Sequence, residues 1–352
     1  MRILVLPGDG IGPEITAATL AVLGAAASRF GLDLEIVEDI AGHESLARYG
    51  TTVRPELVEK ARAADGLILG PTATFDFDPA KGEINPSMFF RKKLDLFANI
   101  RPARTYPGLP SKVGAFDLVV VRENTEGFYA DRNMEEGNAE LKVTQDVVIS
   151  LRRVTRQACN RIARVAFEMA GDRKQHVTAV HKANVLRLGD GMFLAECRDV
   201  ARGFPAVLFD DVIVDAMMAH VVRAPSRFDV IVTTNMFGDI LTDLTAELSG
   251  SIGLGGSLNQ GADYAMAQAA HGSAPDIAGK NIANPYSLIL SAALLIAWYG
   301  RRSNQARFVE AAAGIHRAIE HAILAGEITR DIGGRLGTRE AGEALAARLS
   351  ST

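Results

Sequence analysis

Short apolar runs alternate with amphipathic helical patterns through most of the chain, and this alternation limits the fold more than any other feature. The runs typical of strands are 3–6, 34–38, 66–69, 118–121, 177–181, 212–214 and 229–233. The helical patterns lie at 13–29, 55–64, 147–169, 192–201 and 240–248. Such alternation is typical of an α/β protein with a largely parallel sheet. After Leu254 a glycine-rich stretch leads into a part that we expect to be mostly helical.

The bulk properties of the sequence limit its organisation and partners. The length of 352 residues favours two domains. A formal net charge of -4 gives no strong basic field, so we expect neither nucleic acid nor a membrane as a partner. The apolar stretch 287–299 is shorter than the roughly 20 residues of a bilayer span and is interpreted as a buried helix. The basic, proline-containing segment 81–110 is interpreted as a connector.

Two features predict a cytoplasmic protein. Cys159 and Cys197 are too few for a disulfide framework and lie in helix-like surroundings, so we expect reduced, structural thiols. The apolar run at the start of the sequence is too short for a signal peptide.

The opening loop, VLPGDGIGPE at residues 5–14, has three glycines between an expected strand and an expected helix. The dinucleotide fingerprint G-x-G-x-x-G would place its third glycine one position later than Gly12. Pro13 also removes an N–H from the start of the helix, where phosphate would bind. We therefore expect a tight turn in the wall of a cleft, near a ligand but without a grip on phosphate, and not an ordinary Rossmann fold.

Two aspartates four positions apart, Asp239 and Asp243, lie in FGDILTDL. Residues at this spacing share one helix face, so the two carboxylates repel each other unless a cation lies between them. Oxygen ligands suit Mg²⁺ or Mn²⁺, although such a pair is also typical of a solvated helix face. The apolar strand before the pair favours the metal site, because ligands bind at the carboxyl ends of parallel strands. Asp215, at the end of another strand, is a candidate third ligand.

Further charged and polar residues are candidates for binding and proton transfer. Arg91, Arg101 and Arg122 could hold a di- or tricarboxylate, since guanidinium groups pair bidentately with carboxylates. Tyr129 and Lys182 could transfer protons. Each of the five, taken singly, is also compatible with a structural or surface role.

A loop of small residues, HGSAPDIAGK at 271–280, could let the backbone approach a ligand closely. Asp276 in this loop could accept hydrogen bonds from ribose hydroxyls and would repel a 2′-phosphate. An ordinary structural turn is the alternative interpretation.

Together these motifs resemble the isocitrate/isopropylmalate dehydrogenase family of metal-dependent, decarboxylating 2-hydroxyacid dehydrogenases. The resemblance covers nearly the whole chain and is carried by GDGIGPE, FANIRPAR, VRENTEGFY, HKANVL, FDVIVTTNMFGDILTDL and HGSAPDIAGKNIANP. It implies the fold of that family, with two domains around a largely parallel twisted sheet. Residues 1–97 plus 250–352 would bind the cofactor, and 98–249 would bind substrate and metal and form a dimer contact.

The resemblance also implies a role for each candidate residue. In a homodimer with shared active sites, Asp239 and Asp243 would bind Mg²⁺ or Mn²⁺ together with Asp215 of the other subunit. Tyr129 would donate a proton, and Lys182, also lent across the dimer, would assist deprotonation of the hydroxyl. The implied substrate-binding residues are Arg91, Arg101, Arg122, Asn85, Ser87 and Met88. The implied cofactor-binding residues are Ile11, Asn184, His271, Gly272, Ser273, Ala274, Asp276, Ile277 and Asn284.

The implied reaction is the NAD-dependent oxidative decarboxylation of a 3-substituted malate to a 2-keto acid, CO₂ and NADH. Asp276 followed by Ile277 resembles the NAD-using members. The third substituent of the malate stays open, because Asn85 and Ser87 favour a polar group and Met88 an apolar one. A tartrate or D-malate dehydrogenase with broad selectivity is one alternative. A catalytically silent regulatory subunit is another, although such a subunit should lack one of the catalytic or metal-binding residues.

Overall fold

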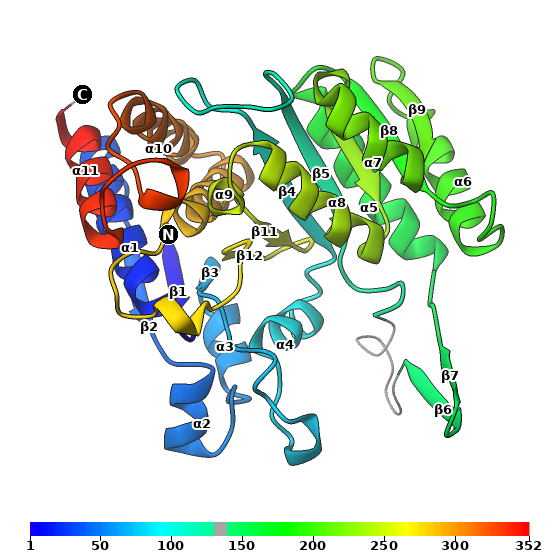
Figure 1. The fold of residues 1–352 in the computed structure, drawn as a ribbon, viewed down its shortest axis with the longest axis horizontal. Helices are drawn as coiled ribbons and strands as arrows, with labels where there is room; N and C mark the ends of the chain where they lie inside the picture. Colours follow the sequence, from blue (N-terminus) through cyan, green and yellow to red (C-terminus); the bar gives the residue numbers. More distant parts are fainter. Residues whose placement is uncertain (130–138, 352) are drawn as a thin grey trace. The chain divides into compact units, whose positions relative to one another are not determined.

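The structure is a computed structural model that describes residues 1–129 and 139–351, and the chain divides into two compact units. Unit 1 consists of Met1–Leu94, Tyr106–Pro110 and Ser249–Thr352. Unit 2 consists of Asp95–Thr105 and Ser111–Leu248. Each unit has its own strands and helices and is described separately below (Figure 1).

Unit 1 contains five strands in the order β2-β1-β3-β12-β11. β1 runs parallel to β2 and β3, β3 runs parallel to β12, and β11 is antiparallel to β12. The strands are β1 (Arg2–Leu6), β2 (Glu35–Glu38), β3 (Gly66–Leu69), β11 (Leu258–Gln260) and β12 (Ala265–Gln268). The helices are α1 (Gly12–Phe30), α2 (His43–Tyr49), α3 (Leu57–Arg62), α4 (Pro86–Lys93), α9 (Tyr286–Arg302), α10 (Ala306–Leu324) and α11 (Thr338–Ser351). Short 3-10 turns form η1 (Pro79–Lys81), η4 (Ile252–Leu254), η5 (Pro275–Ile277) and η6 (Arg330–Ile332).

The apolar stretch 287–299 lies within α9, and most residues of this helix are buried, as predicted. α9 packs against α10, α1 and β12. Two serines on α9 bind backbone carbonyls inside this packing: Ser287 donates to Gly255 O at 2.6 Å and Ser291 donates to Gln268 O at 2.9 Å. No helix in the described part of the chain has the length and hydropathy that a bilayer crossing requires.

The described part of unit 2 contributes five strands to its main sheet, in the order β4-β5-β10-β8-β9, and two further strands form a separate hairpin. β5, β10, β8 and β9 are parallel, and β4 is antiparallel to β5. The strands are β4 (Ala98–Arg104), β5 (Asp117–Glu123), β8 (His176–His181), β9 (Leu208–Ile213) and β10 (Val230–Thr233), with η3 (Pro225–Arg227) before β10. The helices are α5 (Arg156–Gly171), α6 (Gly189–Ala201), α7 (Val214–Arg223) and α8 (Asn235–Leu248). The parallel pairs in both units confirm the predicted α/β class.

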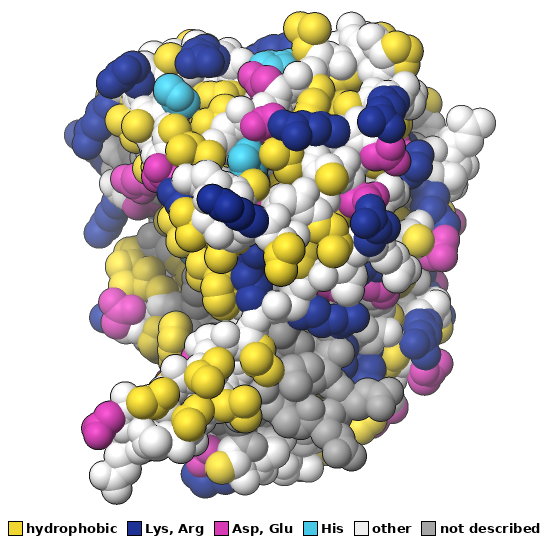
Figure 2. Space-filling model, turned by 90° about the vertical axis from the view of Figure 1, so that its right-hand side faces the viewer, with side chains coloured by type: hydrophobic (Ala, Val, Ile, Leu, Met, Phe, Trp, Pro, Cys, Tyr) yellow, Lys and Arg dark blue, Asp and Glu magenta, His cyan; other side chains and the backbone are white. Residues whose placement is uncertain are grey.

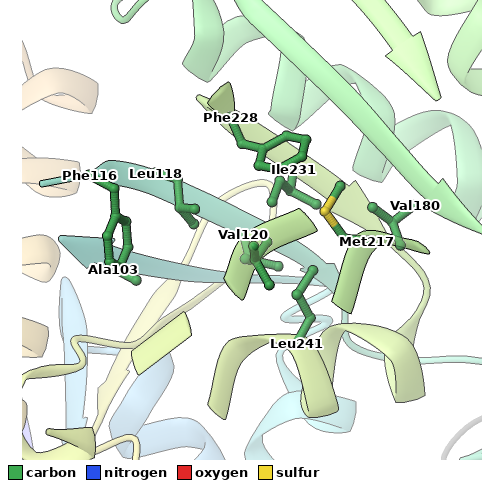
Figure 3. Packing of buried hydrophobic residues seen from close by; sticks show 10 residues of the cluster. Ala103, Phe116, Leu118, Val120, Val180, Met217, Phe228, Ile231 and Leu241 are labelled. Carbon is green, nitrogen blue, oxygen red and sulfur yellow. The ribbon is translucent and has the colours of Figure 1, made fainter. Parts of the chain in front are cut away.

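A buried apolar cluster holds α7 and α8 against the sheet of unit 2. Val120, Ile231 and Val180 come from three neighbouring parallel strands, and Met217 and Leu241 come from the two helices (Figure 3). All five side chains are fully buried. The cluster therefore fixes the start of α8 relative to the carboxyl ends of β5 and β10.

One prediction about local structure is wrong, and another is incomplete. The pattern at 147–169 is not one helix: β6 (Glu140–Thr144) and β7 (Val147–Ser150) form a hairpin, and α5 begins only after Thr155, whose Oγ1 accepts from Ala158 N at 3.2 Å. Three consecutive β-branched residues at 147–149 favour the strand. Segment 81–110 does connect the two units, as predicted, but it also contains α4 and β4. Pro86 lies in the first turn of α4, where a missing N–H costs little.

Candidate active site

The glycines of the opening loop serve close backbone contacts. A Cβ on Gly8 would overlap the carbonyl oxygen of Pro71, and one on Gly10 would overlap the carbonyl oxygen of Ser273. Both glycines have positive φ, at 75° and 60°. The amide of Ile11 donates to Ser273 O at 2.9 Å. The loop is thus a tight turn that packs on the 271–277 segment within unit 1.

The 271–277 segment presents an acidic side chain at the surface of unit 1. Ala274 adopts a left-handed conformation with φ of 38°, and the 3-10 turn η5 follows it. Asp276 is exposed, and its carboxylate has no hydrogen bond or ion pair with any residue that the structure describes. Its oxygens can therefore accept from hydroxyl donors. His271 and Ile277 are partly buried, Gly272 is exposed and Ser273 is buried.

Asn284 lies at the start of α9 and is nearly buried. Its Nδ2 donates to Asp331 Oδ2 at 2.9 Å, and its Oδ1 accepts from Tyr286 N at 2.9 Å. Both ends of this side chain therefore bind groups of unit 1 itself.

In unit 2, Arg122 is the penultimate residue of β5 and is buried, with 3% of its surface exposed. Its Nε and Nη2 donate to Asn235 Oδ1 at 3.0 and 2.7 Å, and its Nη1 forms an ion pair with Asp239. Gly238 makes room for this side chain, because a Cβ there would lie 2.6 Å from Arg122 Cγ. The start of α8 thus holds the guanidinium in one orientation.

Charged side chains gather beside Arg122. Asp239 and Asp243 lie one turn apart on α8, and the hydroxyl of Tyr129 donates to Asp239 Oδ2 at 3.3 Å. Burial raises the pKa of Asp243, the charge of Arg101 opposes this rise, and the charge of Asp239 adds to it. Burial and the charge of Arg122 lower the pKa of Arg101 to about 10. Four sequence-predicted residues therefore interact electrostatically, and Tyr129 is hydrogen-bonded to one of them.

Lys182 and Asp215 form a separate pair in unit 2. Lys182 follows β8, and its Nζ donates to Asp215 Oδ1 in the first turn of α7 at 2.5 Å. This hydrogen bond lowers the pKa of Asp215. Asn184, two residues further on, is exposed. Among residues 1–129 and 139–351, no three His, Cys, Asp or Glu side chains form a metal-binding group, so Asp215 does not join Asp239 and Asp243 within one chain.

The predicted specificity residues lie on α4 in unit 1. Asn85 caps this helix, since its Oδ1 accepts from Met88 N at 3.2 Å. Ser87 Oγ donates to Gln268 Oε1 at 2.9 Å, and Arg91 Nη2 donates to the same oxygen at 3.2 Å. Arg91 thus belongs to unit 1, whereas Arg101 and Arg122 belong to unit 2.

Three residues that orient the site were not predicted as site residues. Asn235 binds Arg122, Asn99 Oδ1 accepts from Arg101 Nε at 2.8 Å, and buried Asp190 accepts from the amide of Lys182 at 2.5 Å. Asn99 could have been predicted, because it lies two positions before Arg101 on one strand and such residues share one face of the sheet. Asp190 had none.

Comparison with known proteins places this arrangement among oxidoreductases. The model of the isocitrate/isopropylmalate dehydrogenase family matches residues 2–345, and the chain belongs to this family of decarboxylating dehydrogenases. It is 39% identical to 3-isopropylmalate dehydrogenase of Archaeoglobus fulgidus and 41% identical to isocitrate/homoisocitrate dehydrogenase of Thermus thermophilus, each over 99% of both chains. The crystal structure of isocitrate dehydrogenase from Methylococcus capsulatus matches with a TM-score of 0.88 and 37% identity, over 99% of both chains.

Proposed function

We propose that this protein catalyses the NAD-dependent oxidative decarboxylation of a 3-substituted malate, with Mg²⁺ or Mn²⁺. The observation that supports this most is the group in unit 2 in which Asp239 and Asp243 lie beside Arg101 and Arg122, with Tyr129 hydrogen-bonded to Asp239. Carboxylates for a cation, guanidinium groups for an acid and a phenol for proton transfer are what the reaction requires.

The donor set fits a hard divalent cation. Asp239 and Asp243 offer only oxygen atoms, and their mutual repulsion contributes to the raised pKa of Asp243. One chain supplies two of the three proposed ligands, and we assign the third to Asp215 of the partner subunit. When bound, the ion would polarise the 2-hydroxyl and then the 2-keto oxygen of the substrate.

The residues of the chain divide the remaining tasks. We assign the carboxylates of the substrate to the three arginines Arg91, Arg101 and Arg122. Lys182 accepts the proton of the 2-hydroxyl while hydride passes from the carbon that bears this hydroxyl to NAD⁺. After the C–C bond breaks and CO₂ departs, the Tyr129 hydroxyl protonates the carbon that retains the electron pair.

We assign the cofactor to unit 1 and the substrate and metal chemistry mainly to unit 2. The unpaired, exposed carboxylate of Asp276 suits the two hydroxyls of an adenosine ribose and would repel a 2′-phosphate. The hydrogen bond from Ile11 to Ser273 places the opening loop beside this segment. The glycines Gly8 and Gly10 allow the backbone contacts. We assign Asn184 to the nicotinamide.

A homodimer with shared active sites accounts for the exposed apolar hairpin. On β6 and β7, Leu141 is 53% exposed and Val148 57% exposed, and Val143 and Ile149 are also exposed. Figure 2 shows hydrophobic side chains at the surface on this side of the molecule, among lysines and arginines. An isolated two-stranded hairpin with apolar side chains on both faces is stabilised when another chain covers it.

We also propose a reducing compartment such as the cytoplasm. Cys159 and Cys197 are both free and buried. Neither forms a disulfide, which agrees with a protein kept reduced.

The test is a substrate panel of isocitrate, homoisocitrate, 3-isopropylmalate, D-malate and tartrate with NAD⁺ and Mn²⁺, with and without chelator. We expect NADH from at least one acid, and its loss on chelation. NADH formation that ignores the chelator would contradict the metal role, and absence of NADH with every acid would contradict the function.

The cofactor assignment has its own test. Replacing Asp276 with Lys should lower kcat/KM for NAD⁺, because a hydroxyl acceptor is lost. Asp33→Lys is the matched control, since Asp33 is also an exposed aspartate of unit 1. Equal kcat/KM for NAD⁺ in the two variants would remove Asp276 from the cofactor site.

A further inference from the structure

We propose that Gln268 determines substrate specificity by accepting the hydrogen bond of the Ser87 hydroxyl. Ser87 then has no proton to donate to a ligand, so the position beside Arg91 accepts a malate whose third substituent carries no carboxylate. This inference rests on the proposed function and names the substrate class within it.

The hydrogen-bond direction follows from the chemistry of the three groups. Ser87 Oγ and Arg91 Nη2 lie 2.9 and 3.2 Å from Gln268 Oε1. A guanidinium can only donate, so the amide atom that faces Arg91 must be the oxygen and not the nitrogen. That oxygen carries no proton, so the Ser87 hydroxyl must be the donor. Ser87 therefore presents only lone pairs to a ligand.

The backbone of Gln268 is held on both sides. It is the last residue of β12, opposite Leu69 of β3. Its N–H donates to Ser257 O at 3.1 Å, and its carbonyl accepts from Ser291 Oγ at 2.9 Å. The acceptor that takes the Ser87 proton is thus a fixed part of the sheet.

Ser87 lies beside any ligand that Arg91 binds. The two side chains reach the same oxygen atom, and residues four apart share one face of α4. Met88, three residues before Arg91 and half-buried, lies toward the same side. Asn85, whose side-chain oxygen caps the helix, lies about 120° round the helix axis from Arg91. Apart from Arg91, the near face of α4 therefore offers an acceptor and an apolar side chain.

This environment distinguishes between substituents. A carboxylate next to Ser87 meets lone pairs in place of a proton, so it gains no hydrogen bond there and is repelled. A hydroxyl can donate to Ser87, and an alkyl group can pack on Met88. A malate with an alkyl, hydroxyl or hydrogen substituent fits, whereas one with a carboxyalkyl substituent does not.

The test is the ratio of kcat/KM for isocitrate to kcat/KM for 3-isopropylmalate, measured with NAD⁺ and Mn²⁺ on one preparation, so that losses of folded enzyme cancel. We expect a ratio below one for the natural protein. Gln268→Ala frees the Ser87 proton and should raise the ratio about tenfold, as expected for a regained hydrogen bond to a charged group. Gln268→Glu keeps an acceptor on a side chain of the same length and should not raise it.

Ser87→Ala supplies the second variant. In the natural background it removes the repelling lone pairs, so it should not lower the ratio of isocitrate to 3-isopropylmalate turnover, and in the Gln268→Ala background it should abolish the gain. A natural protein that favours isocitrate, an unchanged ratio in Gln268→Ala, or a selective loss of isocitrate turnover in Ser87→Ala overturns the inference. The Ser87→Ala measurement tests the inference even if the Gln268→Ala variant does not fold. If no acid in the panel yields NADH, the proposed function has failed first, and the inference falls with it.

Discussion

The side-chain oxygen of Asn235 accepts two hydrogen bonds from the guanidinium of Arg122, at 3.0 Å from Nε and 2.7 Å from Nη2. Both side chains are buried, and Asn235 Nδ2 donates to Glu126 O at 3.0 Å. The amide thus ties Arg122 to the segment that leads to Tyr129. An arginine held along one edge keeps its remaining N–H groups in a fixed direction, which lowers the entropy cost of binding a carboxylate.

Asn235→Ala should therefore lower kcat/KM for the substrate by about 10- to 100-fold, mainly through KM, because hydrogen bonds to a charged group contribute about 1.5–3 kcal/mol. Steady-state kinetics with varied substrate would measure the effect. Asn235→Asp keeps the acceptor but loses the donor to Glu126 O, so it should retain more activity. An alanine variant with unchanged KM would show that Arg122 needs no such support.

Gly238 provides the second support of Arg122, through the absence of a side chain. A Cβ there would lie 2.6 Å from Arg122 Cγ and 2.8 Å from Arg122 Cβ. Gly238→Ala should displace the arginine and raise KM for the substrate. Gly24→Ala is the control: Gly24 is also helical, but no atom lies within 4 Å of a Cβ there. That variant should gain about 1 kcal/mol of stability and keep its kinetics. Equal KM values for the two variants would contradict the steric argument.

The fold class and a set of candidate site residues could be predicted from the sequence, because both depend on local patterns. Buried parallel strands are continuous apolar runs, and β3 and β10 have the form GLIL and VIVT. β11 and β12 are only three and four residues long, too short for a periodicity to be visible. The hairpin residues 147–150 were misassigned because an exposed apolar strand and the apolar face of a helix look alike over so few positions.

The partners that orient the site were out of reach for a different reason. Asn235 and Arg122 are 113 positions apart, and Gln268 and Ser87 are 181 apart, so their contacts exist only once the sheet has formed. A single sequence contains no local trace of such pairs. The candidate site residues carry a chemical signature in the sequence, whereas most of the residues that orient them do not.

The contact between the opening loop and the 271–277 segment gives a further prediction. Gly10→Ala would push a methyl group into the carbonyl oxygen of Ser273, and should raise KM for NAD⁺. Gly31→Ala is the control for backbone strain, since φ is 60° at Gly10 and 62° at Gly31, while a Cβ on Gly31 meets open space. Gly31→Ala should lose about 1 kcal/mol of stability in thermal unfolding through strain alone, and Gly10→Ala should lose more because of the added overlap. If the KM for NAD⁺ is the same in both variants, the opening loop does not contribute to cofactor binding.

The two cysteines should be unreactive in the folded protein. Burial raises the pKa of Cys159 to about 12 from its ordinary 9.0, and burial also raises the pKa of Cys197. The folded state therefore keeps these protons while the unfolded state loses them, so this stabilising contribution is complete below pH 9 and disappears as the pH rises toward 12.

A disulfide reagent at about pH 8 should label neither thiol until denaturant is added, because the thiolate is the reactive form. Ser28→Cys, which places a thiol at an exposed position on α1, should react at once and serves as the positive control. Rapid labelling of the native protein would mean that α5 and α6 open readily.

The separation of the Lys182–Asp215 pair from Asp239 and Asp243 gives the last prediction. If each active site takes Lys182 from one chain and Asp239 from the other, Lys182→Ala and Asp239→Asn homodimers are both inactive. Unfolding and refolding a mixture of the two variants forms hybrid dimers in which one site has both natural residues and the other has neither. An equal mixture should then recover about a quarter of the natural rate. Each variant refolded alone should show no activity. The two variants refolded separately and then mixed, so that no hybrid dimer forms, should show none either. If the mixture stays inactive while chromatography shows hybrid dimers, Lys182 and Asp239 do not come from different chains, and the proposal of shared active sites is wrong.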